Sequence, residues 1–193
     1  MADTLRAFIA ISLPQEVRQA LAGVQGKLAD RRFPIRWVNT ESIHLTLKFL
    51  GEIFVSNVGP IMEVMERAAQ NHAGFKATAK GLGVFPGYKN PRIVWAGLTG
   101  GVKTLADLSR DLETGLEELG FARENRPFSA HLTLGRVKAP VDGRVLARAM
   151  EEAALFEAPE FDVTAITLYK SDLQRTGPVY TVVGEARLGA EDR

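Results

Sequence analysis

The 193-residue chain has no cysteine, only three histidines and a formal net charge of +1. Without cysteine there can be no disulfide and no thiolate metal site, and nothing favours secretion. A charge this close to zero argues against a protein that coats long nucleic acids through bulk electrostatics. It still allows a local basic pocket that binds one or two phosphates.

Long hydrophobic runs are also missing, and no apolar stretch is long enough to span a bilayer. The N-terminal segment 1–17 has a short apolar run but neither a basic leader nor a cleavage signal, and this is typical of a first strand. We therefore expect a cytoplasmic protein with no membrane partner. The sequence indicates no exposed apolar helix that would need a partner subunit, so we expect a monomer.

The chain does contain a regular succession of helical and extended patterns, with no flexible linker between them. Apolar residues at helical spacing predict four helices, within residues 15–28, 57–74, 102–119 and 142–158. Gly120 stands where a glycine C-cap would end the third helix. Runs of β-favouring residues predict strands within 5–12, 35–38, 44–50, 75–85, 92–98, 131–137, 161–173 and 178–188.

The order of these patterns repeats. Each half has a long helix, a strand that carries the phrase H-L-T-L, a second helix and a closing pair of strands. We interpret this as an internal duplication folded into a single bilobal domain that covers residues 1–193, with the two lobes interleaved.

Two of the three histidines open the H-L-T-L phrase, at His44 and at His131. Side chains alternate faces along a strand, so His44 shares a face with Thr46, and His131 shares a face with Thr133. The leucines of each phrase then point into a core. Each imidazole lies about two residues of strand rise, roughly 7 Å, from a hydroxyl, and such a pair can bind adjacent oxygens of one small anion.

A single His-x-Thr in a strand is usually just a polar strand face. The second copy, in the matching half and with the same apolar neighbours, favours a function. His72 has none of this context and is interpreted as a surface residue at a helix C-terminus. A metal site would need a further ligand in phase with either phrase, and only Glu41 and Glu52 lie near the first.

Two imidazoles and two hydroxyls facing one cleft suit phosphoester chemistry without a metal. One imidazole takes a proton from water, the other gives a proton to the leaving oxygen, and the hydroxyls donate to the non-bridging oxygens. Two near-equivalent histidines do not reveal which one gives and which one takes. Serine and cysteine nucleophile motifs, Walker A and dinucleotide fingerprints are absent.

Paired H-x-T-x phrases in a duplicated chain of this length resemble the 2H phosphoesterase superfamily. Within it the chain is similar to the RNA 2′,3′-cyclic phosphodiesterases, long called 2′-5′ RNA ligases. The similarity extends over nearly the whole chain and includes "RAFIAI", "GVFPGYKNPRIVWAGL" and "LYKSDLQRTGPVYTVV". The resemblance implies a bilobal α+β fold with two antiparallel sheets lining a central cleft and helices outside.

The resemblance also implies an activity, which is the opening of a 2′,3′-cyclic phosphate at an RNA 3′ end to leave a 2′-phosphate. It implies no metal and no organic cofactor. His44 matches the general acid that protonates the 3′ oxygen, and His131 matches the general base that activates water. Thr46 and Thr133 match the phosphate-binding hydroxyls.

Several other residues are candidates for substrate contacts. Lys48 is in phase with His44 and Thr46, so it either adds charge to the cleft or is a solvated lysine. Arg136 is out of phase with His131 and reaches the cleft only if Gly135 marks a bulge or the end of the strand.

Aromatic and hydroxyl side chains complete the candidates. Trp95 either stacks on a base or lies in the core, and Arg92 could hold a phosphate. Candidates for the rim of the cleft are Phe49, Phe85, Tyr169 and Ser171.

Two competing functions stay open at this point. The same site could join RNA ends reversibly through a 2′-5′ linkage, although water at ~55 M favours hydrolysis. A binding module for nucleotides or RNA ends that has lost catalysis would not need both proton-transfer groups.

Overall fold

The computed structural model describes residues 3–175 and 177–189, so the two ends of the predicted domain lie outside the described residues. The helices are α1 (Gln15–Ala29), α2 (Val58–Gln70), α3 (Val102–Glu118) and α4 (Gly143–Glu152), with 3-10 turns at Thr40–Ser42 and Val55–Asn57. The strands are β1 (Thr4–Ile11), β2 (Ile35–Trp37), β3 (Leu45–Phe54), β4 (Phe75–Phe85), β5 (Ile93–Thr99), β6 (His131–Val137), β7 (Phe161–Val163), β8 (Ala165–Gln174) and β9 (Gly177–Arg187).

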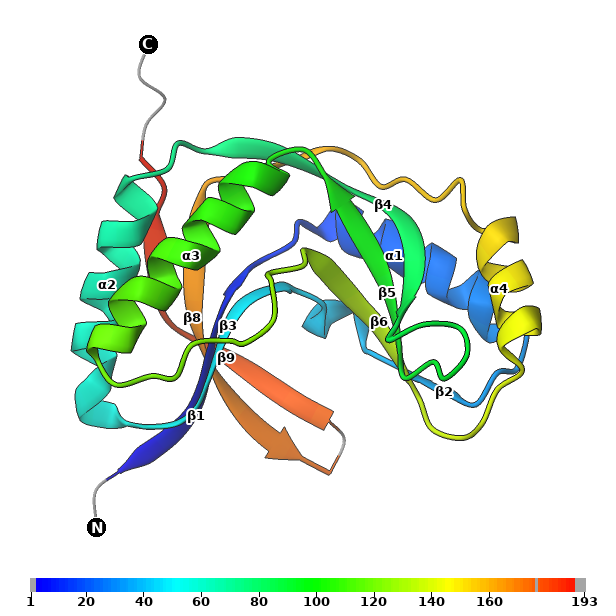
Figure 1. Cartoon of the computed structure of the whole chain (residues 1–193), viewed down its shortest axis with the longest axis horizontal. Coiled ribbons are helices and arrows are strands. Elements are labelled where there is room, and N and C mark those ends of the chain that lie inside the picture. The colour runs from blue at the N-terminus through cyan, green and yellow to red at the C-terminus, as the bar shows by residue number, and fades with distance from the viewer. Residues whose placement is uncertain (1–2, 176, 190–193) are drawn as a thin grey trace.

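The strands form two antiparallel sheets, as the resemblance implies. A four-stranded sheet has the order β3-β1-β8-β9, and a five-stranded sheet has the order β2-β6-β5-β4-β7. Helices α2 and α3 lie on the side of the four-stranded sheet, and α1 and α4 lie on the side of the five-stranded sheet (Figure 1). The fold is therefore α+β with an approximate twofold relation, in which β3 and β1 correspond to β6 and β5.

The two halves exchange strands, and the sequence does not predict which strands are exchanged. The β4–β5 pair ends the first half of the chain, yet it joins the sheet of the second H-L-T-L strand, β6. The β8–β9 pair joins the sheet of the first, β3, through β1. In addition, the single strand expected within 161–173 is two strands, β7 and β8, in different sheets. A local pattern identifies a strand or a hairpin, but it does not identify the sheet to which that strand adds.

Helix α3 shows how the sequence fixes an element and its end. Leu105, Leu108, Leu112 and Leu116 recur at helical spacing and are fully buried. Gly120 adopts φ +88°, as the predicted glycine C-cap requires. Its N–H donates to the carbonyl of Glu117, and the N–H of Phe121 donates to the carbonyl of Leu116. These two bonds are those of a Schellman motif, which satisfies carbonyls that the helix end leaves free.

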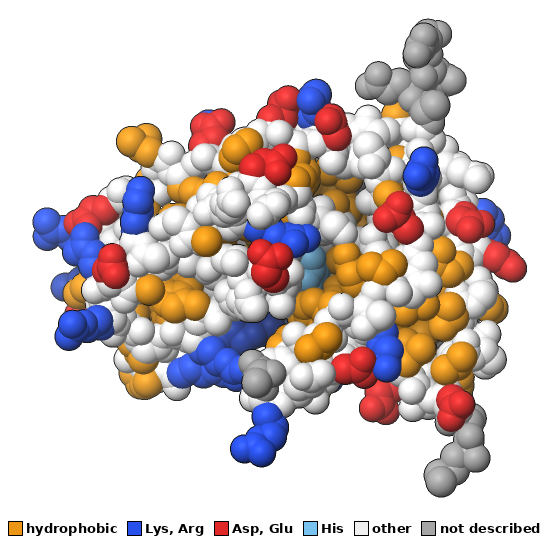
Figure 2. Space-filling model, turned by 180° about the vertical axis from the view of Figure 1, so that it is seen from behind, with side chains coloured by type: hydrophobic (Ala, Val, Ile, Leu, Met, Phe, Trp, Pro, Cys, Tyr) orange, Lys and Arg blue, Asp and Glu red, His pale blue; other side chains and the backbone are white. Residues whose placement is uncertain are grey.

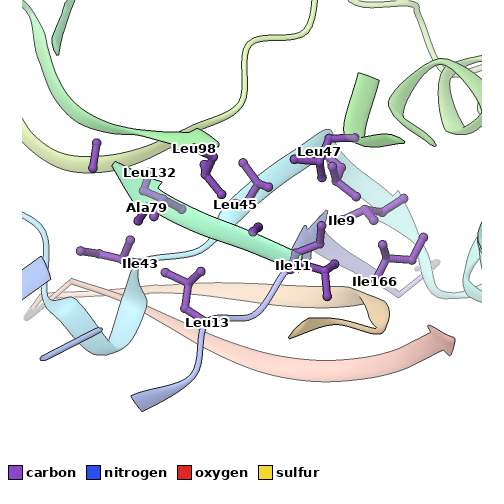
Figure 3. Close-up of a cluster of buried hydrophobic side chains, with 14 of the residues drawn as sticks. Ile9, Ile11, Leu13, Ile43, Leu45, Leu47, Ala79, Leu98, Leu132 and Ile166 are labelled. Carbon is purple, nitrogen blue, oxygen red and sulfur yellow. The ribbon is translucent and has the colours of Figure 1, made fainter. Parts of the chain in front are cut away.

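The two sheets share one hydrophobic core. Figure 3 shows Ile9, Ile11 and Leu45 of the four-stranded sheet beside Ala79 and Leu132 of the five-stranded sheet, and all five are buried. The strands that carry the two phrases, β3 and β6, also contact each other. The leucines of both phrases thus join the sheets and hold the two histidine strands close together. In the described part of the chain, no helix is long and apolar enough to cross a membrane.

Candidate active site

The alternation predicted for both H-L-T-L phrases is present. Leu45 and Leu47 of the first phrase are buried, as are Leu132 and Leu134 of the second. The threonines point to the other face, where Thr46 pairs with Ala10 on β1 and Thr133 pairs with Trp95 on β5. His44 lies just before β3, and His131 is the first residue of β6. Each phrase therefore presents its histidine and its threonine away from the shared core.

Both imidazoles are oriented by the same local hydrogen bond. Nδ1 of His44 lies 2.8 Å from the carbonyl oxygen of Ser42, and Nδ1 of His131 lies 2.7 Å from that of Ser129. A carbonyl oxygen only accepts, so Nδ1 carries the proton and donates in both cases. Nε2 is then the ring nitrogen that carries no proton in the neutral imidazole. The repeated phrase thus extends to S-x-H-L-T-L, since a serine stands two residues before each histidine.

His44 is surrounded by aromatic rings. Phe8 stacks on its imidazole with ring centroids 4.6 Å apart, and Tyr180 meets it edge-on at 5.2 Å. Burial lowers the pKa of His44 below its ordinary value, and the hydrogen bond to the Ser42 carbonyl only partly opposes this. In the free protein His44 therefore favours the neutral imidazole.

We expect the His44 imidazole to titrate below its ordinary pKa of 6.5 in the free protein and to titrate higher when inorganic phosphate is bound. The folded state resists protonation of His44 more than the unfolded state does. The free energy of unfolding should therefore fall as the pH drops below 6.5 toward the folded-state pKa. Imidazole ¹⁵N signals followed by NMR against pH, with and without phosphate, measure both values. A free-protein pKa at or above 6.5 would contradict this account of the site.

The four-stranded sheet lines its side of the site with aromatic side chains. In the β1–β8 register, Phe8 pairs with Tyr169. Ser171 pairs with Tyr180 across β8 and β9. Cross-strand partners share a face, so the predicted residues Tyr169 and Ser171 lie on the face of His44. The hydroxyl of Tyr169 is 2.6 Å from that of Ser12.

Sequence reasoning missed Phe8 and Tyr180, both of which contact His44. Phe8 stands within an apolar run, so the sequence pattern does not distinguish it from the core residues around it. Burial raises the pKa of the Tyr180 hydroxyl, and the positive charges of Arg136 and Arg6 partly oppose this rise. Arg136 belongs to the five-stranded sheet, so its influence shows that the two sheets approach each other at Tyr180.

The five-stranded sheet contributes Phe85 and Trp95 beside the second phrase. The Phe85 ring meets His131 edge-on at 5.1 Å and also packs against Trp95 at the same distance. Trp95 pairs with Thr133 and is half-buried, so it belongs to the site face rather than to the core. Its Nε1 is buried and has no hydrogen-bond partner within the described residues. Its ring lies across Gly83, where an added Cβ would come within 2.2 Å of the indole.

A β-bulge follows the threonine of each phrase and changes which residues face the site. The register shifts by one residue after Thr46 and again after Thr133, so Leu47 and Leu134 are the extra residues. Beyond the bulges Phe49 pairs with Phe8, and Arg136 pairs with Ile93. The bulges therefore bring Phe49 and Arg136 onto the faces of the histidines, and Arg136 reaches this face through a bulge at Leu134, next to the Gly135 at which the sequence placed it.

The same bulge makes the prediction for Lys48 wrong. Lys48 pairs with Ile9, on the core side of β1, and it is only 7% exposed. Its Nζ donates to both carboxylate oxygens of Glu113, at 2.8 and 2.7 Å, and to the carbonyl of Ala122. Its charge is thus neutralised on the side of α3 and does not reach the face of His44.

Arg92 lies just before β5 with an exposed side chain. Its backbone N–H donates to the Phe85 carbonyl, and its own carbonyl accepts from Val137. The first bond closes the end of the β4–β5 hairpin, and the second ties this end to β6. The structure therefore places Arg92 at the end of this hairpin, and no side-chain hydrogen bond or ion pair of Arg92 is found within the described residues.

The molecular surface is hollowed where these elements meet. Figure 2 shows a histidine at the base of a hollow in the middle of this face, with hydrophobic side chains on the side of the four-stranded sheet and Lys and Arg side chains below it on the other side. Within residues 3–175 and 177–189, no group of three or more His, Cys, Asp and Glu side chains could hold a metal ion.

Comparison with known proteins shows the family to which the chain belongs. The model of the LigT-like phosphoesterase family matches residues 11–95 and 99–180, so each match contains one H-L-T-L phrase. The chain belongs to this family of 2H phosphoesterases.

Several of its relatives are named RNA 2′,3′-cyclic phosphodiesterase. The protein from Thermotoga maritima is 34% identical over 95% of this chain and 95% of its own. The protein from Methanothermobacter thermautotrophicus is 32% identical over 95% of this chain and 99% of its own. Among solved structures, TT0787 of Thermus thermophilus is 32% identical, covers 97% of this chain and 100% of its own, and has a TM-score of 0.80.

Proposed function

We propose that this protein hydrolyses 2′,3′-cyclic phosphates at RNA 3′ ends to 2′-phosphates, without a metal, through acid–base catalysis by His44 and His131. The observation that carries the proposal is a pair of imidazoles, one just before β3 and one at the start of β6, on two strands that contact each other. Nδ1 of each imidazole donates to a backbone carbonyl, which leaves Nε2 for proton transfer. The names of the relatives support the same substrate class.

In the proposed reaction, Nε2 of His131 takes a proton from water as the water oxygen forms a bond to phosphorus. The bond between phosphorus and the 3′ oxygen breaks, and Nε2–H of His44 gives its proton to that oxygen. The products are a 2′-phosphate and a free 3′-hydroxyl. Thr46 and Thr133 donate hydrogen bonds to the two non-bridging oxygens, on which charge builds in the transition state.

A histidine with a lowered pKa can serve as the general acid only if substrate binding raises that pKa. Burial among Phe8 and Tyr180 disfavours imidazolium in the free protein. The phosphodiester brings a negative charge beside the ring, and an adjacent opposite charge raises the pKa of a histidine. Proton donation by His44 is thereby tied to the presence of the anion that needs it.

The direct test is an RNA oligonucleotide with a 2′,3′-cyclic end, incubated with the protein in excess EDTA. We expect full turnover, because the described residues offer no metal ligand set, and we expect a 2′-phosphate as the product, identified by ³¹P NMR. Loss of turnover in EDTA with recovery on adding zinc or manganese would contradict the metal-free mechanism. A 3′-phosphate product would show that the other ester bond breaks, and a 2′-5′-joined product would show end joining.

A further inference from the structure

A buried ion pair joins the strand of the first phrase to the segment that leads to the second. Nζ of Lys48 on β3 donates to both carboxylate oxygens of Glu113 on α3 and to the carbonyl of Ala122, at 2.7 Å. An ammonium group has three N–H donors, so these bonds use all of them. The Glu113 side chain is 14% exposed, and its Oε2 also accepts from the backbone N–H of Glu124. The pair therefore holds a backbone carbonyl at residue 122 and a backbone N–H at residue 124.

These two backbone groups belong to the loop between α3 and β6, residues 119–130, which carries the carbonyl that orients His131. Figure 1 shows this α3–β6 loop running from the lower end of α3 past β3 to the start of β6. Near its end, the Ser129 carbonyl accepts the bond from Nδ1 of His131. Outside the helices and sheets, no backbone–backbone hydrogen bond in the described part of the chain involves residues 122–130. The course of the loop therefore depends on side chains.

The first phrase does not depend on such a contact. Ser42, whose carbonyl orients His44, lies in the 3-10 turn Thr40–Ser42. There the N–H of Ser42 donates to the carbonyl of Asn39, whose side chain caps the turn. His44 thus bonds to a carbonyl that its own turn holds, whereas His131 bonds to a carbonyl in a loop that is held from outside.

Other side chains also tie the α3–β6 loop to its surroundings, but through weaker or less directional contacts. The ring of Phe128 packs against the core, and hydrophobic packing is non-directional. Nε of Arg123 donates to Glu117 on α3 at 2.7 Å, with side chains that are 48% and 56% exposed. Exposed ion pairs of this kind contribute little to stability. The Lys48–Glu113 pair, by contrast, is buried and binds the backbone itself.

We propose that Lys48 and Glu113 are positioning residues, which hold the α3–β6 loop so that the Ser129 carbonyl keeps Nδ1 of His131 protonated and Nε2 available. The inference rests on the proposed function, in which Nε2 of His131 takes a proton from water. Lys48 stands two residues after Thr46 on β3, so the pair also ties the strand of the first phrase to the loop that orients the second histidine. A misplacement of about 1 Å at a reacting group can lower a rate about a hundredfold.

The test uses the double variant Lys48→Met with Glu113→Leu. Either substitution alone would leave a buried charge without its partner, which is strongly destabilising, whereas apolar residues in place of both partners often leave stability unchanged or raise it. We therefore expect clearly lowered melting temperatures for the single variants and recovery of most of the loss in the double variant. The double variant still leaves Ala122 and Glu124 without their side-chain partners, so it separates the position of the loop from overall stability.

In the folded double variant we expect kcat on a 2′,3′-cyclic phosphate to fall by about tenfold or more, while KM changes by about twofold or less. Imidazole ¹⁵N NMR at alkaline pH reports the tautomers. The wild-type protein should show His131 with its proton on Nδ1, and the double variant should show both tautomers. The signals of His44 should stay the same, because the Ser42 carbonyl belongs to a separate turn.

Arg123→Met with Glu117→Leu is the matched control. It removes an ion pair between the same loop and the same helix, but an exposed one, and it should leave kcat, KM and the His131 signals unchanged. A wild-type kcat or a single His131 tautomer in the folded Lys48→Met, Glu113→Leu protein would overturn the proposal. An equal loss of kcat in the control would overturn it as well.

Failure of the proposed function would look different, because the wild-type protein would then turn over no cyclic phosphate. The NMR comparison does not depend on turnover. Mixed His131 tautomers in the Lys48→Met, Glu113→Leu protein alone would still support the role of the pair in fixing the imidazole, and unchanged His131 signals in both double variants would overturn it.

Discussion

His44→Ala and His131→Ala are each expected to lower kcat/KM on a 2′,3′-cyclic phosphate by about 10²–10⁴-fold, the usual worth of a proton-transfer group. Each substitution removes an Nε2 that the Nδ1 bond to a backbone carbonyl positions. Loss of the imidazole leaves either the attacking water or the departing oxygen without its proton partner. Steady-state kinetics on a cyclic mononucleotide measures the effect.

The third histidine supplies the matched control. His72 was expected at the surface after a helix, and it does follow α2, but its side chain is only 13% exposed and its Nε2 lies 2.8 Å from a carboxylate oxygen of Asp111. His72→Ala should cost some stability and leave kcat/KM at the wild-type value once the protein is folded. A loss as large as that of the other two histidines would show that removal of any histidine damages the fold.

The same kinetic experiment should include the two threonines, so that the losses of kcat/KM can be compared among the four site residues. Thr46→Val and Thr133→Val each remove one hydroxyl that donates to a charged oxygen, which is worth about 1.5–3 kcal/mol, or roughly ten- to a hundredfold. Their losses should therefore be smaller than those of the histidines. Threonine variants as impaired as the histidine variants would mean that the hydroxyls have another task, such as orienting the imidazoles.

The sequence predicts the parts of this site that depend on local periodicity. The alternation in H-L-T-L places both threonines with their histidines, and it buries Leu45 and Leu132 where the sheets meet. Leucines at helical spacing and Gly120 predict α3 and its end. These features depend only on side chains a few residues apart, which is why one sequence is enough to predict them.

The features that the sequence does not predict depend on which strands become neighbours. Strict alternation of side chains along the strand would place Lys48 on the face of His44. The bulge at Leu47 instead turns Lys48 toward Glu113, a residue far along the chain. Tyr180 reaches His44 only because the last hairpin of the chain joins the sheet of the first phrase. In the sequence, Gly135 indicates a bulge in β6. No glycine stands beside Leu47, so the sequence does not indicate the bulge in β3.

The two histidines share their local geometry but not their surroundings, and this difference supports the roles that we propose for them. His44 is stacked on Phe8 and met by Tyr180, and burial lowers its pKa. His131 has an edge-on contact with Phe85. A buried imidazole that gains its proton when an anion arrives suits the acid, and a less enclosed imidazole suits a base that must reach water.

A substrate with a good leaving group should separate these roles. A nitrophenyl phosphodiester releases an anion that needs little protonation, so the acid matters less for it. If His44 is the acid, the loss of kcat in His44→Ala should shrink by roughly tenfold or more on this substrate relative to a cyclic phosphate. His131→Ala should stay as impaired as before, because the attacking water still lacks its base.

The pH dependence of the same variants gives an independent reading of the roles. The wild-type kcat/KM should follow a bell-shaped curve, since one imidazole must be neutral while the other is protonated. On the nitrophenyl substrate, His44→Ala should lose the alkaline limb, where the acid would give up its proton, and keep the acidic limb of the base. Rescue of His131→Ala alone, with loss of the alkaline limb in that variant, would reverse the assignment. Equal rescue of both variants would contradict a fixed division of roles, because each imidazole would then serve the leaving oxygen to the same extent.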